Sequence, residues 1–392
     1  MTFFGKSTAL YDEWEDEGVS PFFPVIETNR DHHVTTAKHG DLLMFGSCDY
    51  LGLSQHPTLK QAAIDAIREF GTNTYGAQLL CGRTRLHDGI ERTLTTLSGK
   101  ESAILFPSGM AANQAVISTM AGDEDVILCD RTAHISIYMG SWLSGAELRT
   151  FPHNNVKKLE TLLRKEKDKR RRVILVDGLY SADGDFAPLK EITELAQEHN
   201  AQVVVDEAHS FGAIGPNGLG VADHFGVLDK IDALVGTMSK ALGSVGGFVL
   251  TNQETERQLR YLAPSYTSSR GSAPGVAAAS LASLELITEQ GAQLRKQLDD
   301  NVKHIIDGLT GAGLNLMRTT SHIVPVQIGD EHKTVAVSNW LMDHGIFVGT
   351  FVHPHVPAGE GRLRIGVTST HTQNECALLV ERLTEAKNKF SL

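Results

Sequence analysis

The sequence has little cysteine, and the cysteines it has are scattered. The four are Cys48, Cys81, Cys129 and Cys376, and none belongs to a Cys-x-x-Cys pair. A disulfide framework or a structural zinc site needs cysteines that pair or cluster. His32-His33 and His353-Pro354-His355 lack cysteine or carboxylate neighbours at ligand spacing. We therefore expect free thiols in a reducing compartment and no metal site.

An excess of positive charge and a long apolar run are also absent. Lys and Arg number 36 against 47 Asp and Glu, which gives a net charge of −11. No apolar stretch reaches the roughly 18 residues of a membrane span, and the acidic residues 1–18 do not resemble a signal or transit peptide. The basic run 164–172 contains no aromatic residue, which favours a solvated helix end over a nucleic-acid patch. We expect a cytoplasmic protein with no nucleic-acid partner and no transmembrane segment.

Three common nucleotide-binding and hydrolase motifs are missing. No Gly-x-Gly-x-x-Gly follows an expected strand, Gly99-Lys100 lacks the rest of a P-loop, and no Gly-x-Ser-x-Gly occurs. A dinucleotide fold, a P-loop NTPase and a serine hydrolase of the nucleophile-elbow type are therefore disfavoured.

Short apolar runs alternate with helical patterns from residue 100 onward. The runs are 103–106, 126–129, 173–176, 202–205, 233–235 and 247–250. Their near-continuous apolar character indicates strands covered on both faces by helices, so we predict an α/β fold with a mostly parallel central sheet. We expect an N-terminal arm (1–45), a large domain (46–285) and a smaller C-terminal α+β domain (286–392).

Lys240 lies in a segment rich in glycine and hydroxyl groups, 236–247. It is either a solvated loop amine or a lysine that forms an imine with an aldehyde cofactor. The hydroxyls of Thr237 and Ser239 favour the second interpretation because they can donate hydrogen bonds to a phosphate, and the glycines allow a close approach of the backbone.

Other candidate residues follow the expected strands, where ligands gather in parallel sheets. Asp206 is either a turn residue or a carboxylate that keeps a pyridinium nitrogen protonated, and His209 lies three residues further on. His134 follows another run, and its flat ring suits stacking on an aromatic cofactor. Ser181 is a better candidate than the Asp-Gly turn after it, Asp183–Asp185.

Two further segments suggest anion binding. Ser108-Gly109-Met110 follows a strand and opens a helix, so free backbone N–H groups and the positive helix end can face a phosphate. Arg362 and Arg364 share one face of an expected strand, where an arginine pairs either with a substrate carboxylate or with a surface acid. The spacing alone does not choose between them.

Taken together, these segments resemble the α-oxoamine synthase family of fold-type I pyridoxal phosphate (PLP) enzymes. The resemblance covers about residues 40–390. It depends on DYLGL (49–53), FPSGMAAN (106–113), His-x-Ser (134–136), DGLYSADGDFAPL (177–189), VVDEAHSFGAIGPNGLG (204–220), GTMSKALGSVGG (236–247) and RLRIGVTSTH (362–371). That order of motifs is far more specific than any one of them.

The resemblance implies a role for each candidate residue. Lys240 would hold PLP and act as acid and base at the substrate Cα, Asp206 would pair with the pyridinium, His134 would stack on the ring, and His209 would contact its phenolic oxygen. The phosphate contacts would be Ser108, Gly109, Met110 and Thr237, together with Ser269 of a second subunit. That last contact implies a homodimer with shared active sites, and Arg364 matches the arginine that binds the substrate carboxylate.

The implied reaction is the decarboxylative condensation of a small L-amino acid (serine, glycine or alanine) with an acyl-CoA or other acyl thioester, giving an α-aminoketone. The pattern is most similar to serine palmitoyltransferases. The alternatives are an autoinducer-type or aminooxononanoate synthase, a fold-type I aminotransferase, and an inactive partner subunit. Three positions depart from the family pattern: Cys48, in a segment that touches the amino acid, Gln78 and Arg270.

Overall fold

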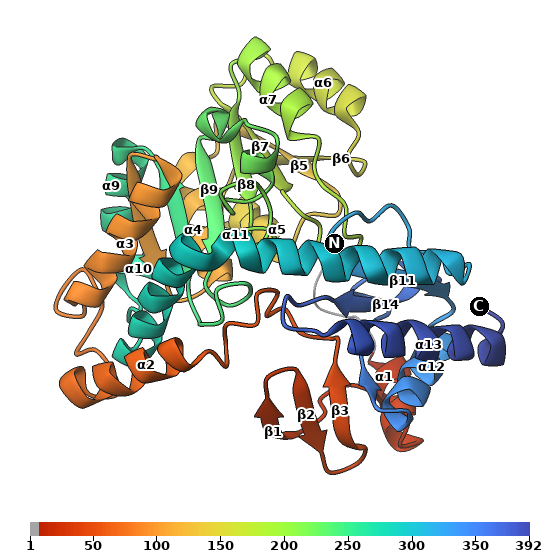
Figure 1. The fold of residues 1–392 in the computed structure, drawn as a ribbon. Coiled ribbons are helices and arrows are strands. Elements are labelled where there is room, and N and C mark those ends of the chain that lie inside the picture. The colour runs from red at the N-terminus through yellow and green to blue at the C-terminus, as the bar shows by residue number, and fades with distance from the viewer. Residues whose placement is uncertain (1–7) are drawn as a thin grey trace. The chain divides into compact units, whose positions relative to one another are not determined.

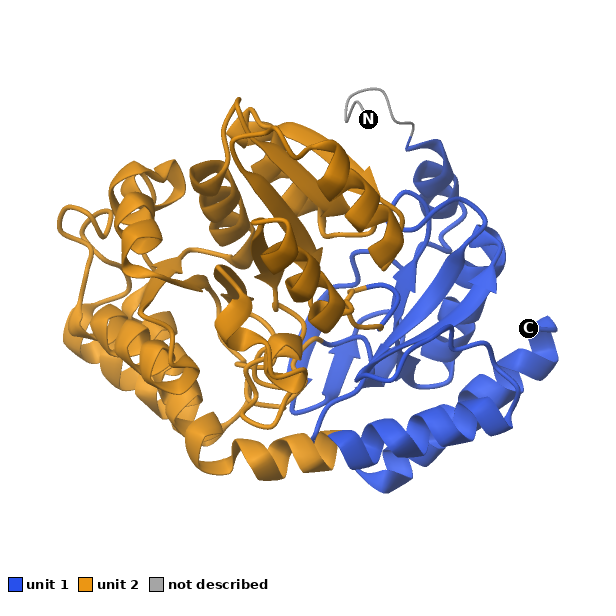
Figure 2. Cartoon of the chain, turned by 90° about the horizontal axis from the view of Figure 1, so that it is seen from above, with its two compact units in different colours: residues 1–47, 182–184, 299–392 blue, residues 48–181, 185–298 orange. Residues whose placement is uncertain are grey.

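The computed structural model describes residues 8–392, which form two compact units (Figure 2). Unit 1 holds the chain up to residue 47, residues 182–184 and residues 299–392. Unit 2 holds residues 48–181 and 185–298. The expected boundary at 285/286 falls inside a helix that continues to Gly311, whereas the chain leaves unit 2 at residue 298. The expected N-terminal arm belongs to the same unit as the C-terminal residues.

Unit 2 is built on a seven-stranded sheet with the order β4-β10-β9-β8-β7-β5-β6 (Figure 1). The strands are β4 (Ser102–Phe106), β5 (Val126–Asp130), β6 (Glu147–Phe151), β7 (Arg172–Asp177), β8 (Gln202–Asp206), β9 (Ala233–Thr237) and β10 (Gly247–Thr251). Only β10 runs antiparallel to its neighbours in this sheet, β4 and β9. The predicted α/β fold with a mostly parallel sheet is confirmed.

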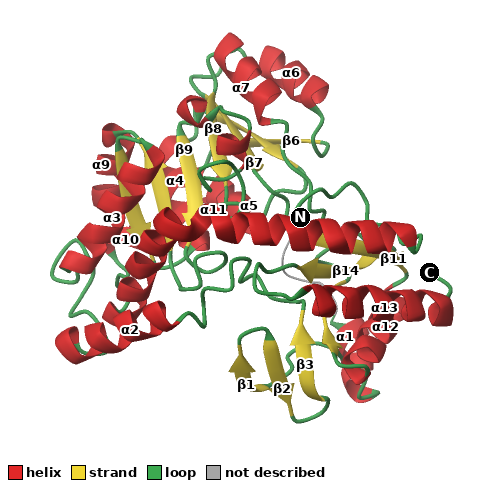
Figure 3. Ribbon diagram, in the orientation of Figure 1, coloured by secondary structure: helices red, strands yellow, loops and turns green. Residues whose placement is uncertain are grey.

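Helices join and cover these strands (Figure 3). They are α2 (Pro57–Phe70), α3 (Arg85–Ser98), α4 (Gly109–Met120), α5 (Ile135–Ser144), α6 (Val156–Lys165), α7 (Leu189–Glu198), α8 (Val221–His224), the 3₁₀ turn Leu228–Lys230, α9 (Gln253–Leu262), α10 (Pro264–Thr267) and the start of α11 (Pro274–Gly311). Helix α4 packs against β9 and β10, α6 against β5 and β6, and α7 against β8. Every residue of β5, β7, β9 and β10 is buried, as the apolar runs predict.

Unit 1 contains two smaller sheets. The first joins β1 (Ile26–Arg30), β2 (His33–Thr36), β3 (Gly40–Met44) and β12 (Ile346–Phe347), and the second joins β11 (Ile323–Gly329), β14 (Gly361–Gly366) and β13 (Gly349–Phe351). Its helices are α1 (Ala9–Asp16), the end of α11, α12 (Glu331–Asp343) and α13 (Gln373–Phe390). Strand β12 pairs with β3, so the first and last parts of the sequence share one sheet.

Three bases of the basic run form ion pairs with nearby acids. Arg164 pairs with Glu160, Lys169 with Glu147, and Arg170 with Asp125, after which β7 begins at Arg172. All four cysteines are free thiols. Among the described helices, none has the length and apolar character needed to cross a bilayer.

Candidate active site

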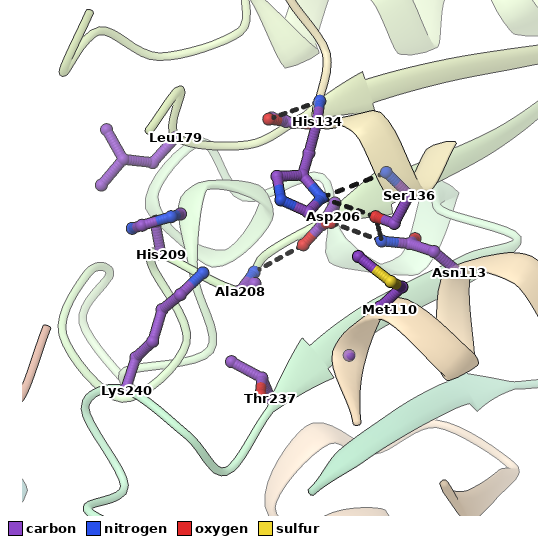
Figure 4. Close-up of a pocket in the computed structure, with 12 residues that line it drawn as sticks. Met110, Asn113, His134, Ser136, Leu179, Asp206, Ala208, His209, Thr237 and Lys240 are labelled. Carbon is purple, nitrogen blue, oxygen red and sulfur yellow. Dashed lines mark hydrogen bonds between the residues drawn. The ribbon is translucent and has the colours of Figure 1, made fainter. Parts of the chain in front are cut away.

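A cavity of about 220 Å³ lies within unit 2 (Figure 4). Its walls come from the carboxyl ends of β7, β8 and β9 and the amino ends of α4 and α5. The lining residues are Gly109, Met110, Asn113, His134, Ser136, Asp177, Leu179, Asp206, Ala208, His209, Thr237 and Lys240. Seven of these are candidates from the sequence: Gly109, Met110, His134, Asp206, His209, Thr237 and Lys240.

Lys240 follows β9 in a loop that folds back on itself. The Thr237 hydroxyl donates to the carbonyl of Gly246 at 2.7 Å and accepts from the Ser239 N–H at 3.1 Å. The Met238 N–H reaches the same carbonyl at 2.9 Å. These bonds fix the start of the loop, and Figure 4 shows the Lys240 side chain extending into the cavity beside His209.

Asp206 is the last residue of β8 and is 6% exposed. One carboxylate oxygen accepts from Asn113 Nδ2 at 2.6 Å, and the other accepts from the Ala208 N–H at 2.8 Å. Burying a carboxylate is costly unless hydrogen bonds compensate for the lost water. The two donors hold Asp206 in one orientation, with its charge at the cavity wall.

His134 precedes α5 and is fixed at both its main chain and its ring. Its N–H lies 3.2 Å from both carboxylate oxygens of Asp177, and its Nδ1 lies 2.7 Å from the Ser136 hydroxyl. Ser136 also accepts from Asn113 Nδ2 at 2.9 Å, so a continuous network links His134 to Asp206. Burial lowers the pKa of His134, and this effect is larger than the opposing effect of Asp206. The imidazole is therefore neutral near pH 7.

His209 forms a hydrogen bond with a buried tyrosine. The Tyr50 hydroxyl lies 2.6 Å from His209 Nδ1, and Tyr50 is 1% exposed. A buried hydroxyl that meets one ring nitrogen fixes the orientation of the imidazole.

The amino end of α4 approaches β9 and β10 closely. Ser108 caps the helix by accepting from the Ala111 N–H at 3.1 Å. A Cβ on Gly109 would lie 3.3 Å from the Thr237 Cβ, and a Cβ on Gly247 would lie 2.2 Å from the Ser108 carbonyl oxygen. Glycine at both positions therefore lets the first N–H groups of a twelve-residue helix stand beside the Thr237 hydroxyl, where an anion fits.

Other candidates in unit 2 do not line this cavity. Ser108 acts as the helix cap, Ser239 is exposed, and Ser181, Ser269 and Cys48 are partly buried outside the lining. The implied roles of these residues stay predictions.

Two of the three departures from the family pattern meet in one region of unit 2. Arg270 is exposed, donates to the Thr74 carbonyl at 2.9 Å and forms a β-bridge with Ala77. Gln78, next to Ala77, is 7% exposed.

The two arginines of β14 in unit 1 differ in their partners. Arg362 is 2% exposed and forms ion pairs with Asp183 and Glu360. The Arg364 guanidinium lies 4.9 Å from the centre of the Phe351 ring and is partly exposed. Ion pairing thus engages Arg362 within its own unit. The role of Arg364 as the arginine that binds the substrate carboxylate stays a prediction from the family resemblance.

Sequence reasoning missed several residues of the cavity. Asn113 lies one helical turn after Gly109, a spacing that places both on one face of α4. Asp177 ends β7 as Asp206 ends β8, so its position after an apolar run was a signal in the sequence that was not used. Tyr50 lies far from the site in the chain, and no local pattern connects it with His209.

The arrangement supports proton transfer beside an aromatic cofactor. It combines a primary amine, a fixed carboxylate, a neutral imidazole and an anion site at a helix end, all in a partly enclosed cavity. An amine and a fixed carboxylate in the same cavity suit imine chemistry with a cofactor that carries a ring nitrogen and a phosphate.

Comparison with known proteins identifies the family. A family profile described as aminotransferase class I and II matches residues 40–383. An 8-amino-7-oxononanoate synthase of Geotalea daltonii is 39% identical over 90% of each chain. A serine palmitoyltransferase of Sphingobacterium spiritivorum is 35% identical over 95% of this chain and 93% of its own. A solved structure of SPT with its PLP internal aldimine superposes with a TM-score of 0.94 at 32% identity, covering 98% of this chain and 97% of the other.

The fold is thus that of a fold-type I transferase. The chain belongs to the aminotransferase class I and II family and, within it, to the α-oxoamine synthase group. The resemblance expected from the motifs is confirmed.

Proposed function

We propose that this protein is a PLP-dependent enzyme that condenses a small L-amino acid with an acyl thioester. The net reaction converts the two substrates into an α-aminoketone, carbon dioxide and the free thiol. The observation that carries the proposal is the meeting of Lys240, Asp206 and His134 in one cavity of a chain from this family.

The residues of the cavity fit PLP. Asp206, held by two donors, suits a protonated ring nitrogen, and His134 supplies a flat neutral ring. The space above Gly109, the α4 N–H groups and Thr237 suit a phosphate dianion. PLP, when bound, supplies an electron sink that stabilises negative charge at the substrate Cα.

The chain's own groups would then move one proton and orient the reactants. The neutral amine of Lys240 takes the Cα proton and returns it after carbon dioxide has left, and Asp206 keeps its partner nitrogen protonated throughout. His209, oriented by Tyr50, is the proposed partner of the phenolic oxygen. Arg364 is the proposed partner of the amino acid carboxylate.

The direct test is incubation of the holoprotein with serine, glycine or alanine and a series of acyl-CoA thioesters. A condensing enzyme releases equal amounts of thiol and carbon dioxide and forms a product whose mass equals that of the α-aminoketone. An aminotransferase would instead form a 2-oxo acid without thiol release, and an inactive partner subunit would form neither product. A preference for serine stays a prediction, because the relatives carry the names of both synthases. A cytoplasmic location also stays a prediction.

We also propose a homodimer with shared active sites. Large apolar side chains stand exposed on unit 2: Tyr75 (91%), Leu80 (80%), Leu143 (66%), Trp142 (46%) and the cavity residue Met110 (42%). Exposed apolar groups of this size suit coverage by a partner. Light scattering should give about twice the 42.6 kDa chain mass, and Leu143→Asp should lower it. A monomer that retains full activity would contradict the shared site.

A further inference from the structure

Two buried carboxylates lie side by side at the ends of β7 and β8. The register of these parallel strands pairs Asp177 directly with Asp206. The two residues are 3% and 6% exposed, and both line the cavity. Asp206 has two strong donors, whereas among the described residues 8–392 Asp177 accepts from one N–H, that of His134, at 3.2 Å.

The surroundings of Asp177 disfavour a second negative charge. The groups that act most on its charge are Asp206 on β8, Asp130 on β5, Lys240 after β9 and the main chain of His134 before α5. The weakly acidic groups that also interact with its charge are the Cys129 thiol on β5, the Tyr138 phenol on α5 and the Tyr180 phenol after β7. Burial, with Asp206 next to it, raises the pKa of Asp177 well above its usual range, although Lys240 and the His134 N–H act in the opposite direction. Two carboxylates that share a site cannot both ionise easily, so one retains its proton.

We infer that Asp177 is a positioning residue that works as a neutral carboxylic acid, so that its oxygen holds the His134 main chain while Asp206 alone carries the negative charge of the cavity. One anion is then matched to one cationic ring nitrogen, a consequence that depends on the proposed PLP function. Asp177 would position the His134 main chain beside the cofactor, and the His134 ring is fixed separately by Ser136.

The distinguishing variant is Asp177→Asn, which keeps the size and an acceptor for the His134 N–H but cannot ionise. We expect Asp177→Asn to bind PLP as wild type does near pH 7, measured by absorbance titration of the apoprotein. Asp177→Ala, which loses the acceptor, should weaken binding by about tenfold. As the pH rises and Asp177 ionises, the wild type should lose affinity while Asp177→Asn does not.

A second readout needs no cofactor. The infrared spectrum of the wild-type apoprotein should contain carboxylic acid C=O absorption near pH 7, and Asp177→Asn should remove one component of it. Glu207→Gln is the control, because burial raises the pKa of Glu207 to about 7 and gives it a band of its own. Carboxylic acid absorption that is unchanged in Asp177→Asn, or PLP binding by Asp177→Asn as weak as that of Asp177→Ala, would overturn the inference. If wild type binds no PLP, the proposed function fails while the infrared result still decides the state of Asp177.

Discussion

Asn113 shows how one neutral side chain organises the charged groups of the cavity. Its amide nitrogen donates to both Asp206 and Ser136, and Ser136 in turn meets the His134 ring. The amide therefore sets the relative positions of the carboxylate and the imidazole. Without Asn113, the Asp206 carboxylate would keep the Ala208 N–H as its donor within the described part of the chain.

Asn113→Ala tests this arrangement at the residue scale. Loss of a hydrogen bond to a carboxylate removes about 1.5–3 kcal/mol, so PLP affinity should fall by about ten- to a hundredfold. The affinity is measured by titrating the apoprotein with PLP. The neighbouring Gln114→Ala serves as control, because Gln114 contacts Met139 and not the cavity network. Equal PLP affinity of the two variants would contradict the role of Asn113 in orienting Asp206.

At the scale of elements, the sequence predicted the buried apolar strands of the central sheet and missed the strands that lack an apolar pattern of their own. All six apolar runs are strands, because a strand buried on both faces must be apolar throughout. Strand β6 was missed because Glu147–Phe151, at the edge of the sheet, contains only two apolar residues and neither a continuous apolar run nor a regular alternation. The β1–β3 sheet was missed because its β1 residues are all exposed, so no apolar pattern marks them.

The same reasoning explains the candidate site. Residues that follow apolar strands were predictable, because the strand itself is visible in the sequence. Tyr50 reaches the site through tertiary packing, of which the sequence carries no local sign, whereas the one-turn spacing of Asn113 from Gly109 was a sign that was not used.

Helix α11 is tied to the segment before α13 by one buried amide. Asn301, 4% exposed, donates to the carbonyls of Thr368 (3.0 Å) and His371 (2.8 Å) and accepts from Gln373 at 2.8 Å. Asn301→Ala leaves these carbonyls buried without their donor, so unfolding free energy should fall by about 2–3 kcal/mol. Urea denaturation measures the change. The exposed Asp300→Ala, on the same helix, is the control, and an equal effect of both variants would contradict the role of the amide.

At the scale of the whole molecule, acid should destabilise the fold through a buried histidine. His371 Nε2 donates to the Met44 carbonyl and its Nδ1 accepts from the Thr368 N–H, both at 3.2 Å, so the neutral ring is fully bonded. Burial, aided by His32, lowers the pKa of His371 from 6.5 to about 3. The folded chain thus binds fewer protons than the unfolded chain between these values.

The stability contributed by neutral His371 is therefore present above pH 6.5 and is lost as the pH falls toward about 3, by up to about 5 kcal/mol. His371→Gln should flatten this part of the curve of unfolding free energy against pH, measured by urea denaturation. His355→Gln removes an exposed imidazole and should leave the curve as in wild type. A curve for His371→Gln as steep as that of wild type would contradict the assignment.

The central claim is that Lys240 is the residue that binds PLP covalently. The most direct measurement is borohydride reduction of the holoprotein, followed by proteolysis and mass spectrometry of the labelled peptide. We expect one pyridoxyl group per chain, on Lys240, and no visible chromophore or turnover in Lys240→Ala. A label on another lysine, or a Lys240→Ala variant that keeps its chromophore and turnover, would contradict it.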